Sequence, residues 1–166
     1  MSAALQIQRI ELNDSIAKEM TAAVEKTILT MFSARPKPEA WRVEGKNSVA
    51  GDVSGLIGFV QDRLEATMAV CFPRDLAIEM MSHLVRRPLT EVDGMVKSGV
   101  GELANVIFGV MKAKLNQSGF TFQATIPTVV VGNNHVLGAV TPAPTLIMPF
   151  ELYGKRFHVL LTIIRE

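Results

Sequence analysis

The sequence TEVDGMVKSGVGELANVIFGVMKAKLNQSG, residues 90–119, predicts the longest element of this chain, a single helix. Thr90 is a good N-cap, the carboxylates of Glu91 and Asp93 suit the positive end of the helix dipole, and Gly119 suits its C-terminal stop. About twenty-seven residues lie between these ends, or ~40 Å of helix. At ~100° per residue the apolar positions fall within one arc, which must pack against another layer of the protein. The arc comprises Val92, Val96, Gly99, Val100, Leu103, Val106, Ile107 and Val110.

The opposite side of this helix carries a polar set within roughly 60° of arc. Its members are Ser98, Glu102, Asn105 and Gly109. Glu102 and Asn105, three positions apart, project side by side. Solvated Glu and Asn are ordinary on a helix, and for the pair alone this is the more economical interpretation. However, Gly94, Gly101 and Gly109 lie in or beside the polar half, and each costs about 1 kcal/mol relative to alanine. Small residues beside a polar pair instead predict a surface that another protein's backbone can approach closely.

Two further helices and several strands account for the rest of the chain. Apolar spacings of three and four predict a helix over residues 11–32, with Asn13 and Asp14 at its start and prolines after its end. Pro73 suits the first turn of a helix over residues 74–85. Strands are predicted at residues 49–60, 65–72, 120–126, 128–131, 145–152 and 157–164, with turns at 61–63, 132–134 and 153–156.

This order of elements predicts an α+β fold in which three helices pack on one face of a largely antiparallel β-sheet. No low-complexity segment or linker divides the chain, so we expect one domain over residues 8–164.

Composition limits the classes of function. Hydrophobic residues make up 48% and charged residues 20% of the chain, which excludes a disordered or coiled-coil protein. A net charge of +1 argues against a dedicated nucleic-acid binder. Cys71 is the only cysteine, so we expect no intramolecular disulfide, a buried inert thiol and an intracellular setting. Residues 1–6 lack a signal-peptide pattern and no apolar run approaches ~20 residues, so we expect a cytoplasmic protein without a membrane segment.

Pro127 is placed near the polar helix face by length arithmetic. From Asn105 to Ser118 the predicted helix rises ~20 Å, and the strand from Phe120 to Ile126 returns by ~20 Å. We therefore expect Pro127 near the level of Glu102 and Asn105. An ordinary edge or bulge proline is an equally good interpretation of the strand alone.

The spacing Ser98-x3-Glu102-x2-Asn105-x21-Pro127 resembles the signature of the CheC/CheX/FliY family of response-regulator phosphatases. Further segments also resemble CheX, and the resemblance covers about residues 8–164. These segments are Val53 to Gly58, Phe72-Pro73 with the helix that follows, Val100 to Asn105, and Pro127 to Gly132.

CheC proteins carry the motif twice, on two pseudo-symmetric helices. The first helix of this chain has Ser15-x3-Glu19-x2-Ala22, in which alanine replaces the amide, and Glu44 stands where the distal proline is expected. The chain therefore resembles CheX more than CheC, and only the helix that carries Asn105 is expected to be active.

The resemblance implies a hydrolase for the aspartyl phosphate of a CheY-like receiver, in chemotaxis or a related two-component pathway. Asn105 would orient the attacking water and Glu102 would pair with the receiver's Lys, while Ser98 and Pro127 would set the shape of the site. No cofactor of its own is implied, because the receiver supplies Mg²⁺. It also implies a homodimer through a sheet edge, for which the C-terminal strands are the expected edge.

Other interpretations remain. The chain could be a non-catalytic module that binds a receiver or another signalling protein, or, less well supported, a structural dimer unit. A zinc site is disfavoured because His83, His135 and His158 lie in separate segments without ligands at suitable spacing. The glycines at 51, 55 and 58 lack the Lys-Ser/Thr of a phosphate-binding loop, and local sequence assembles no Ser, His and acid set.

Overall fold

A computed structural model describes residues 9–139 and 141–165 of the protein. Residues 1–8, 140 and 166 lie outside these ranges. The N-terminal segment 1–6 and the first residue of the predicted domain, residue 8, are among them. Three helices occur in the described part, α1 (Asp14–Phe32), α2 (Arg74–Val85) and α3 (Gly94–Gln117). Its strands are β1 (Lys37–Pro38), β2 (Arg42–Glu44), β3 (Ala50–Gln61), β4 (Leu64–Phe72), β5 (Gln123–Ala124), β6 (Thr128–Val136), β7 (Thr145–Leu152) and β8 (Lys155–Arg165).

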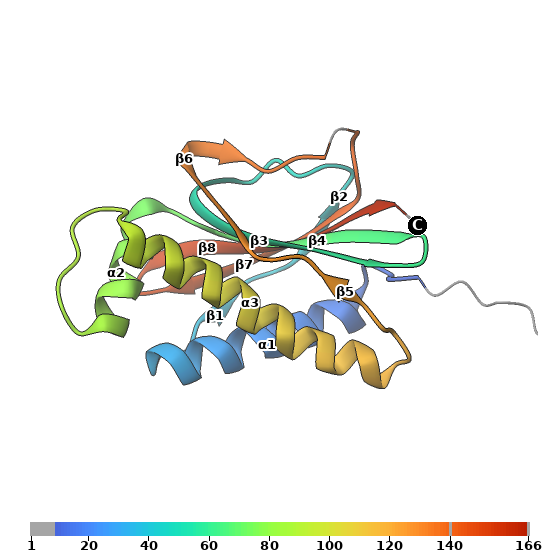
Figure 1. The fold of residues 1–166 in the computed structure, drawn as a ribbon, viewed down its shortest axis with the longest axis horizontal. Coiled ribbons are helices and arrows are strands. Elements are labelled where there is room, and N and C mark those ends of the chain that lie inside the picture. The colour runs from blue at the N-terminus through green and yellow to red at the C-terminus, as the bar shows by residue number, and fades with distance from the viewer. Residues whose placement is uncertain (1–8, 140, 166) are drawn as a thin grey trace, which may run out of the picture.

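All the strands join in one antiparallel sheet. Its main order is β1-β7-β8-β4-β3-β5, with β2 also on β7 and β6 also on β3. Figure 1 shows α1 and α3 along one side of this sheet, with α2 at one end of the helical layer. The α+β fold predicted from the sequence is therefore confirmed.

Helix ends follow the capping side chains. Asn13 Oδ1 accepts a hydrogen bond from the backbone N–H of Ile16 at 3.2 Å, so α1 begins one residue after Asn13. At α3 the N-cap is Asp93, whose Oδ1 accepts from the N–H groups of Met95 and Val96, each at 3.0 Å. The prediction of Thr90 as N-cap is wrong, because the carboxylate three residues later reaches the free N–H groups. α3 is consequently 24 residues long, shorter than expected.

The segment after α3 differs from the prediction. The expected strand over residues 120–126 is reduced to Gln123–Ala124, because only this part pairs with β3. The turn expected at Gly132-Asn133-Asn134 lies instead within β6, which continues to Val136. The pairing register of β6 and β3 shifts between Gly51 and Val53. This irregularity accommodates the Gly132-Asn133-Asn134 segment without ending β6.

The C-terminal strands do not form a free edge. β8 lies between β7 and β4, and β1 and β2 pair with the other side of β7. The edge expected for a dimer was therefore assigned wrongly, because short strands that carry no periodic signal cover it. Among the described residues, the edges without a further strand belong to β1 and β2 on one side and to β5 and β6 on the other.

The core lies between the sheet and the helices. At Gly55 of β3, an added Cβ would lie 2.8 Å from the carbonyl oxygen of Val100 and 3.0 Å from the Cβ of Ala104, so glycine lets α3 sit directly on the sheet. The Phe59 ring packs against that of Phe108, with 4.9 Å between centroids. These contacts fix the position of α3 over β3.

Cys71 lies on β4, in the middle of the sheet. Its side chain is 2% exposed, and burial raises the pKa of the thiol to about 11. The predicted burial of this thiol is therefore confirmed, and the raised pKa is in line with the expected low reactivity.

Candidate functional site

α3 presents the predicted polar residues on its outer side. Ser98, Glu102 and Asn105 are all exposed, and we call this set the polar ridge. The opposite side of the helix is buried, and consists of Val96, Val100, Gly101, Leu103, Ala104, Ile107, Phe108 and Met111. The ridge is thus carried by a helix that is packed along most of its length, which limits the movement of the backbone that bears these side chains.

The polar groups of the ridge are not used within the protein. Within residues 9–139 and 141–165, the side chains of Ser98, Glu102 and Asn105 make no hydrogen bond and no ion pair. The Glu102 carboxylate and the Asn105 amide stand one turn apart on the same helix face. Both are therefore available to a water molecule or to another protein.

β6 flanks the polar ridge on one side. A Cβ added at Gly101 would lie 3.1 Å from Cγ2 of Val129, so this glycine allows the protein's own strand to approach α3. At Gly94 and Gly109 an added Cβ would meet nothing within 4 Å. The prediction that small residues admit another protein is consequently restricted to Gly94 and Gly109, because Gly101 is needed for internal packing.

Pro127 lies in the interval between β5 and β6. β5 ends at Ala124, next to its partner Phe59, and β6 begins at Thr128, opposite Leu56. Pro127 itself is half-buried and belongs to neither strand. As expected for proline, ladder pairing is interrupted there.

α3 crosses β3 at this same level. Gly55 of β3 packs beneath Val100, and the next contact along the strand joins Phe59 to Phe108. Ala124 pairs with Phe59 and Thr128 pairs with Leu56, so Pro127 lies at a level of β3 between these two contacts. The part of α3 at the level of Pro127 therefore includes the ridge positions 102 and 105, in agreement with the length arithmetic.

The second, degenerate copy of the motif does not assemble a comparable site. On α1, Ser15 and Ala22 are exposed and Glu19 is half-buried. Glu44 lies on β2, where its carboxylate accepts hydrogen bonds from Arg42 Nε at 2.7 Å and from Ser48 Oγ at 3.0 Å. The hydrogen bond from Arg42 is the main cause that lowers the pKa of Glu44. Position 22 has no amide, and the Glu44 carboxylate is already hydrogen-bonded to neighbouring residues. α1 therefore lacks the free polar groups that α3 presents.

A Ser–His pair that local sequence did not reveal joins β3 to β6. His135 Nδ1 lies 2.8 Å from the carbonyl oxygen of Gly132, so in the neutral ring Nδ1 carries the proton. Nε2 therefore accepts from Ser54 Oγ at 2.8 Å. Ser54 is fully buried, which prevents a substrate from reaching its hydroxyl. The pair consequently serves to hold β6 in place.

Asp52 anchors the same part of β6. Its carboxylate accepts the backbone N–H of Asn134 at 2.9 Å and that of Arg74, the first residue of α2, at 2.8 Å. These hydrogen bonds lower the pKa of Asp52, the one from Asn134 most strongly. Sequence alone could not find this contact, because the bonded residues are 82 and 22 positions away.

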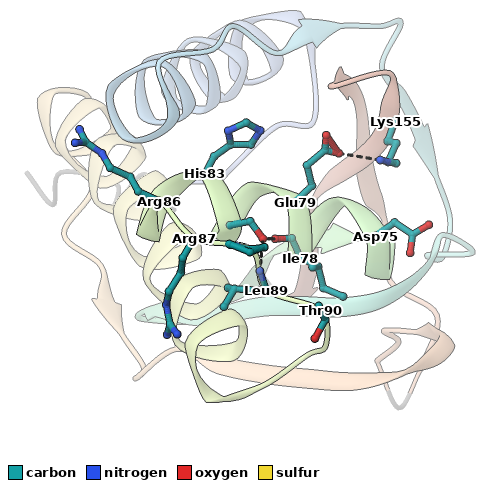
Figure 2. Close-up of a pocket in the computed structure, with 11 residues that line it drawn as sticks. Asp75, Ile78, Glu79, His83, Arg86, Arg87, Leu89, Thr90 and Lys155 are labelled. Carbon is teal, nitrogen blue, oxygen red and sulfur yellow. Dashed lines mark hydrogen bonds and ion pairs between the residues drawn. The ribbon is translucent and has the colours of Figure 1, made fainter.

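A hollow of about 850 Å³ lies beside α2, and Figure 2 shows the residues that line it. Glu79 and Lys155 form an ion pair across its rim at 2.8 Å, so their charges are mutually satisfied. Arg86 and Arg87 extend in different directions in Figure 2 and do not converge on one point. The hollow therefore lacks a focused set of free polar groups, in contrast to the polar ridge.

Neither a metal centre nor a membrane span was found in the part of the chain that the structure describes. No three or more His, Cys, Asp or Glu side chains there gather closely enough to hold a metal ion. No helix among those residues is both long and apolar enough to cross a bilayer.

Several crystal structures share this arrangement. A CheC-like superfamily protein from Shewanella sp. PV-4 is 27% identical, with a TM-score of 0.83, over 91% of this chain and 98% of that one. The chemotaxis protein CheX from Vibrio vulnificus is 29% identical, with a TM-score of 0.82, over 90% of this chain and 99% of its own. A complex of CheX with CheY, BeF₃ and Mg²⁺ from Borrelia burgdorferi is 22% identical, with a TM-score of 0.76, over 93% and 99%. The last supports the fold alone.

These neighbours place the protein in the CheC/CheX class of chemotaxis proteins. The family described as chemotaxis phosphatase CheX matches residues 53–151, more than half of the chain and including both α3 and Pro127. The chain belongs to the CheX family. The comparison with curated protein sequences gave no match.

Proposed function

We propose that the protein hydrolyses the aspartyl phosphate of a CheY-like receiver in chemotaxis or a related two-component pathway. The observation that carries this proposal is the polar ridge, on which Glu102 and Asn105 stand side by side, exposed and without partners among the described residues. A rigid helix that presents free polar groups to solvent can enter the phosphate pocket of another protein.

The reaction requires positioning more than a reactive group. A water molecule attacks phosphorus as the bond to the aspartate oxygen breaks, which regenerates the carboxylate and leaves the water's protons on the released phosphate. The receiver supplies Mg²⁺ and a Lys for charge balance, so this chain needs no nucleophile or metal of its own. Phosphoryl transfer depends mainly on alignment and electrostatics, and one correctly held water satisfies the first requirement.

Asn105 is suited to hold that water. Its amide oxygen accepts a hydrogen bond from the water, and the uncharged group does not repel the phosphoryl oxygens. The exposure of its side chain supports this role, because a buried amide could not enter a second protein. The helix beneath it is packed on β3 through Gly55, which fixes the backbone position from which the amide projects.

Glu102 and the neighbouring residues position the receiver against α3. Its carboxylate, one turn from Asn105, pairs with the receiver's Lys and sets how deeply α3 enters. Ser98 and Pro127 shape the surface around the pair. The match of the CheX family over residues 53–151 supports a CheY-like partner. In the complex from Borrelia burgdorferi, whose CheX shares the fold, that CheX binds CheY.

The test is phosphate release from a purified receiver phosphorylated by a small phosphodonor. The wild-type protein should accelerate dephosphorylation, and Asn105→Ala should reduce the maximal rate by about 10²-fold or more because an orienting group is lost. Gln117→Ala removes another exposed amide from the same helix and should leave the rate unchanged.

An unchanged rate for Asn105→Ala would contradict the mechanism. Binding of the receiver without any acceleration by the wild-type protein would instead support the non-catalytic signalling module.

A further inference from the structure

Ile126 is an exposed apolar side chain next to the candidate site. It is 86% exposed, whereas the other exposed large hydrophobic side chains of the described residues lie between 38% and 50%. Isolated apolar residues on a surface are common and need no explanation by themselves. The backbone that carries Ile126 and its position distinguish it from the others.

The backbone on both sides of Ile126 is held firmly. The N–H of Thr125 donates to the carbonyl oxygen of Gly58 at 2.8 Å, and the N–H of Gly58 donates to Thr125 Oγ1 at 3.0 Å. Two residues after Ile126, Thr128 begins the pairing of β6 with β3. Pro127 fixes its own φ and restricts the conformation of the residue before it. Ile126 is therefore displayed on a short, preorganised arch, residues 125–128.

The arch lies beside the polar ridge. Along β3, the arch lies at a level between Gly55 and Phe59, the two residues on which α3 packs. The part of α3 between these two contacts includes positions 102 and 105. A protein large enough to enclose the Asn105 side chain must therefore cover the neighbouring arch as well. In such a complex Ile126 would leave water.

An anchor of this kind contributes binding energy at little conformational cost. Removal of a large aliphatic side chain from water favours association, and a backbone ordered in advance loses little entropy when it binds. Interfaces commonly concentrate affinity in a few side chains surrounded by weaker contacts.

We propose that Ile126 is the apolar anchor by which the receiver is held against the polar ridge. In the complex it is buried against the receiver beside the phosphoaspartate pocket, and it sets affinity and choice of receiver while Asn105 acts on the water. This inference rests on the proposed function, since it concerns the partner of the same site.

The experiment separates binding from chemistry. Single-turnover dephosphorylation is measured at increasing concentrations of wild type, Ile126→Ser, Ile126→Leu and Val43→Ser. Ile126→Ser should raise the half-saturating concentration about tenfold and leave the maximal rate unchanged. Ile126→Leu should restore wild-type affinity, because a similar aliphatic volume is retained. Val43→Ser removes an aliphatic side chain that is 44% exposed on β2, at the opposite sheet edge, and should behave as wild type.

A second measurement distinguishes failure of this inference from failure of the proposed function. Binding of the receiver carrying beryllofluoride, followed by fluorescence anisotropy, needs no hydrolysis. Weaker binding by Ile126→Ser, with no turnover by wild type, would retain the anchor and reject the enzyme. Wild-type affinity for Ile126→Ser, or a lower maximal rate at unchanged affinity, would overturn the anchor. A wild-type protein that neither binds nor hydrolyses would overturn both.

Discussion

Asp52 illustrates at the scale of one residue how side chains outside the site keep it in shape. Its carboxylate bonds to backbone N–H groups of β6 and α2, and so ties the strand beside the polar ridge to the rest of the fold. Spacing in the sequence is enough to find Glu102 and Asn105, because they lie three positions apart on one helix. It cannot find Asp52 or the Ser54–His135 pair, because their partners become neighbours only when β6 pairs with β3.

The lowered pKa of Asp52 predicts a pH-dependent contribution to stability. Its folded pKa lies below the unfolded value, so the contribution is present above the unfolded pKa and is lost as pH falls through the folded one. Asp52→Ala should therefore lower the free energy of unfolding in urea by about 1 kcal/mol at pH 7. The difference from wild type should shrink below about pH 4.

Glu151→Ala on β7 is the control for Asp52→Ala. It removes an exposed carboxylate that makes no hydrogen bond within the described residues. A stability difference for Asp52→Ala that stayed constant from pH 7 to pH 3 would show that the charge of the carboxylate is not involved.

At the scale of elements, strong periodicity decided what could be predicted. α1 and α3 were located from apolar spacing and β4 from its partial alternation, because each is long enough to show a period. β3, β7 and β8 were located from the turns beside them. β1, β2 and β5 have only two or three residues and exist because they align with β7 or β3. The start of α3 was misplaced because Thr90 and Asp93 both suit an N-cap, and only the backbone path selects between them.

Two glycines of α3 offer a test of how the polar ridge is packed. Gly109→Ala adds a methyl group in open space and should stabilise the protein by about 1 kcal/mol through helix propensity. Gly101→Ala brings the same gain in helix propensity, but the new Cβ would lie 3.1 Å from Cγ2 of Val129, so this side chain of β6 must shift slightly. Thermal and urea unfolding should therefore show a clearly smaller gain, or a loss, for Gly101→Ala. Equal gains would mean that β6 does not press on α3.

At the scale of the whole molecule, the distribution of free edges bears on assembly. The sheet is closed by short strands on the side of β7, while β6 pairs only with β3 within the described residues. Val131 and Val136 on β6 are about half exposed. An edge with apolar side chains and free backbone groups tends to pair with another strand.

We accordingly predict a homodimer that forms through β6 and not through the C-terminal strands. Light scattering at micromolar concentration should give twice the mass of one chain, and Val131→Lys should shift the protein to monomer because a charge blocks strand pairing. A control substitution, Val43→Lys on β2, should leave the dimer intact. A monomeric mass for the wild type would contradict the prediction.

The position of Cys71 allows transient opening of the fold to be measured by cysteine labelling. Cys71 is buried in a small apolar cluster with Val49, Ala69, Ile147 and Leu160, separate from the main core, and burial raises the pKa of its thiol to about 11. Alkylating reagents at neutral pH can therefore modify it only when this cluster opens. The rate of that labelling reports how often this cluster opens, and no dye or engineered probe is needed to follow it.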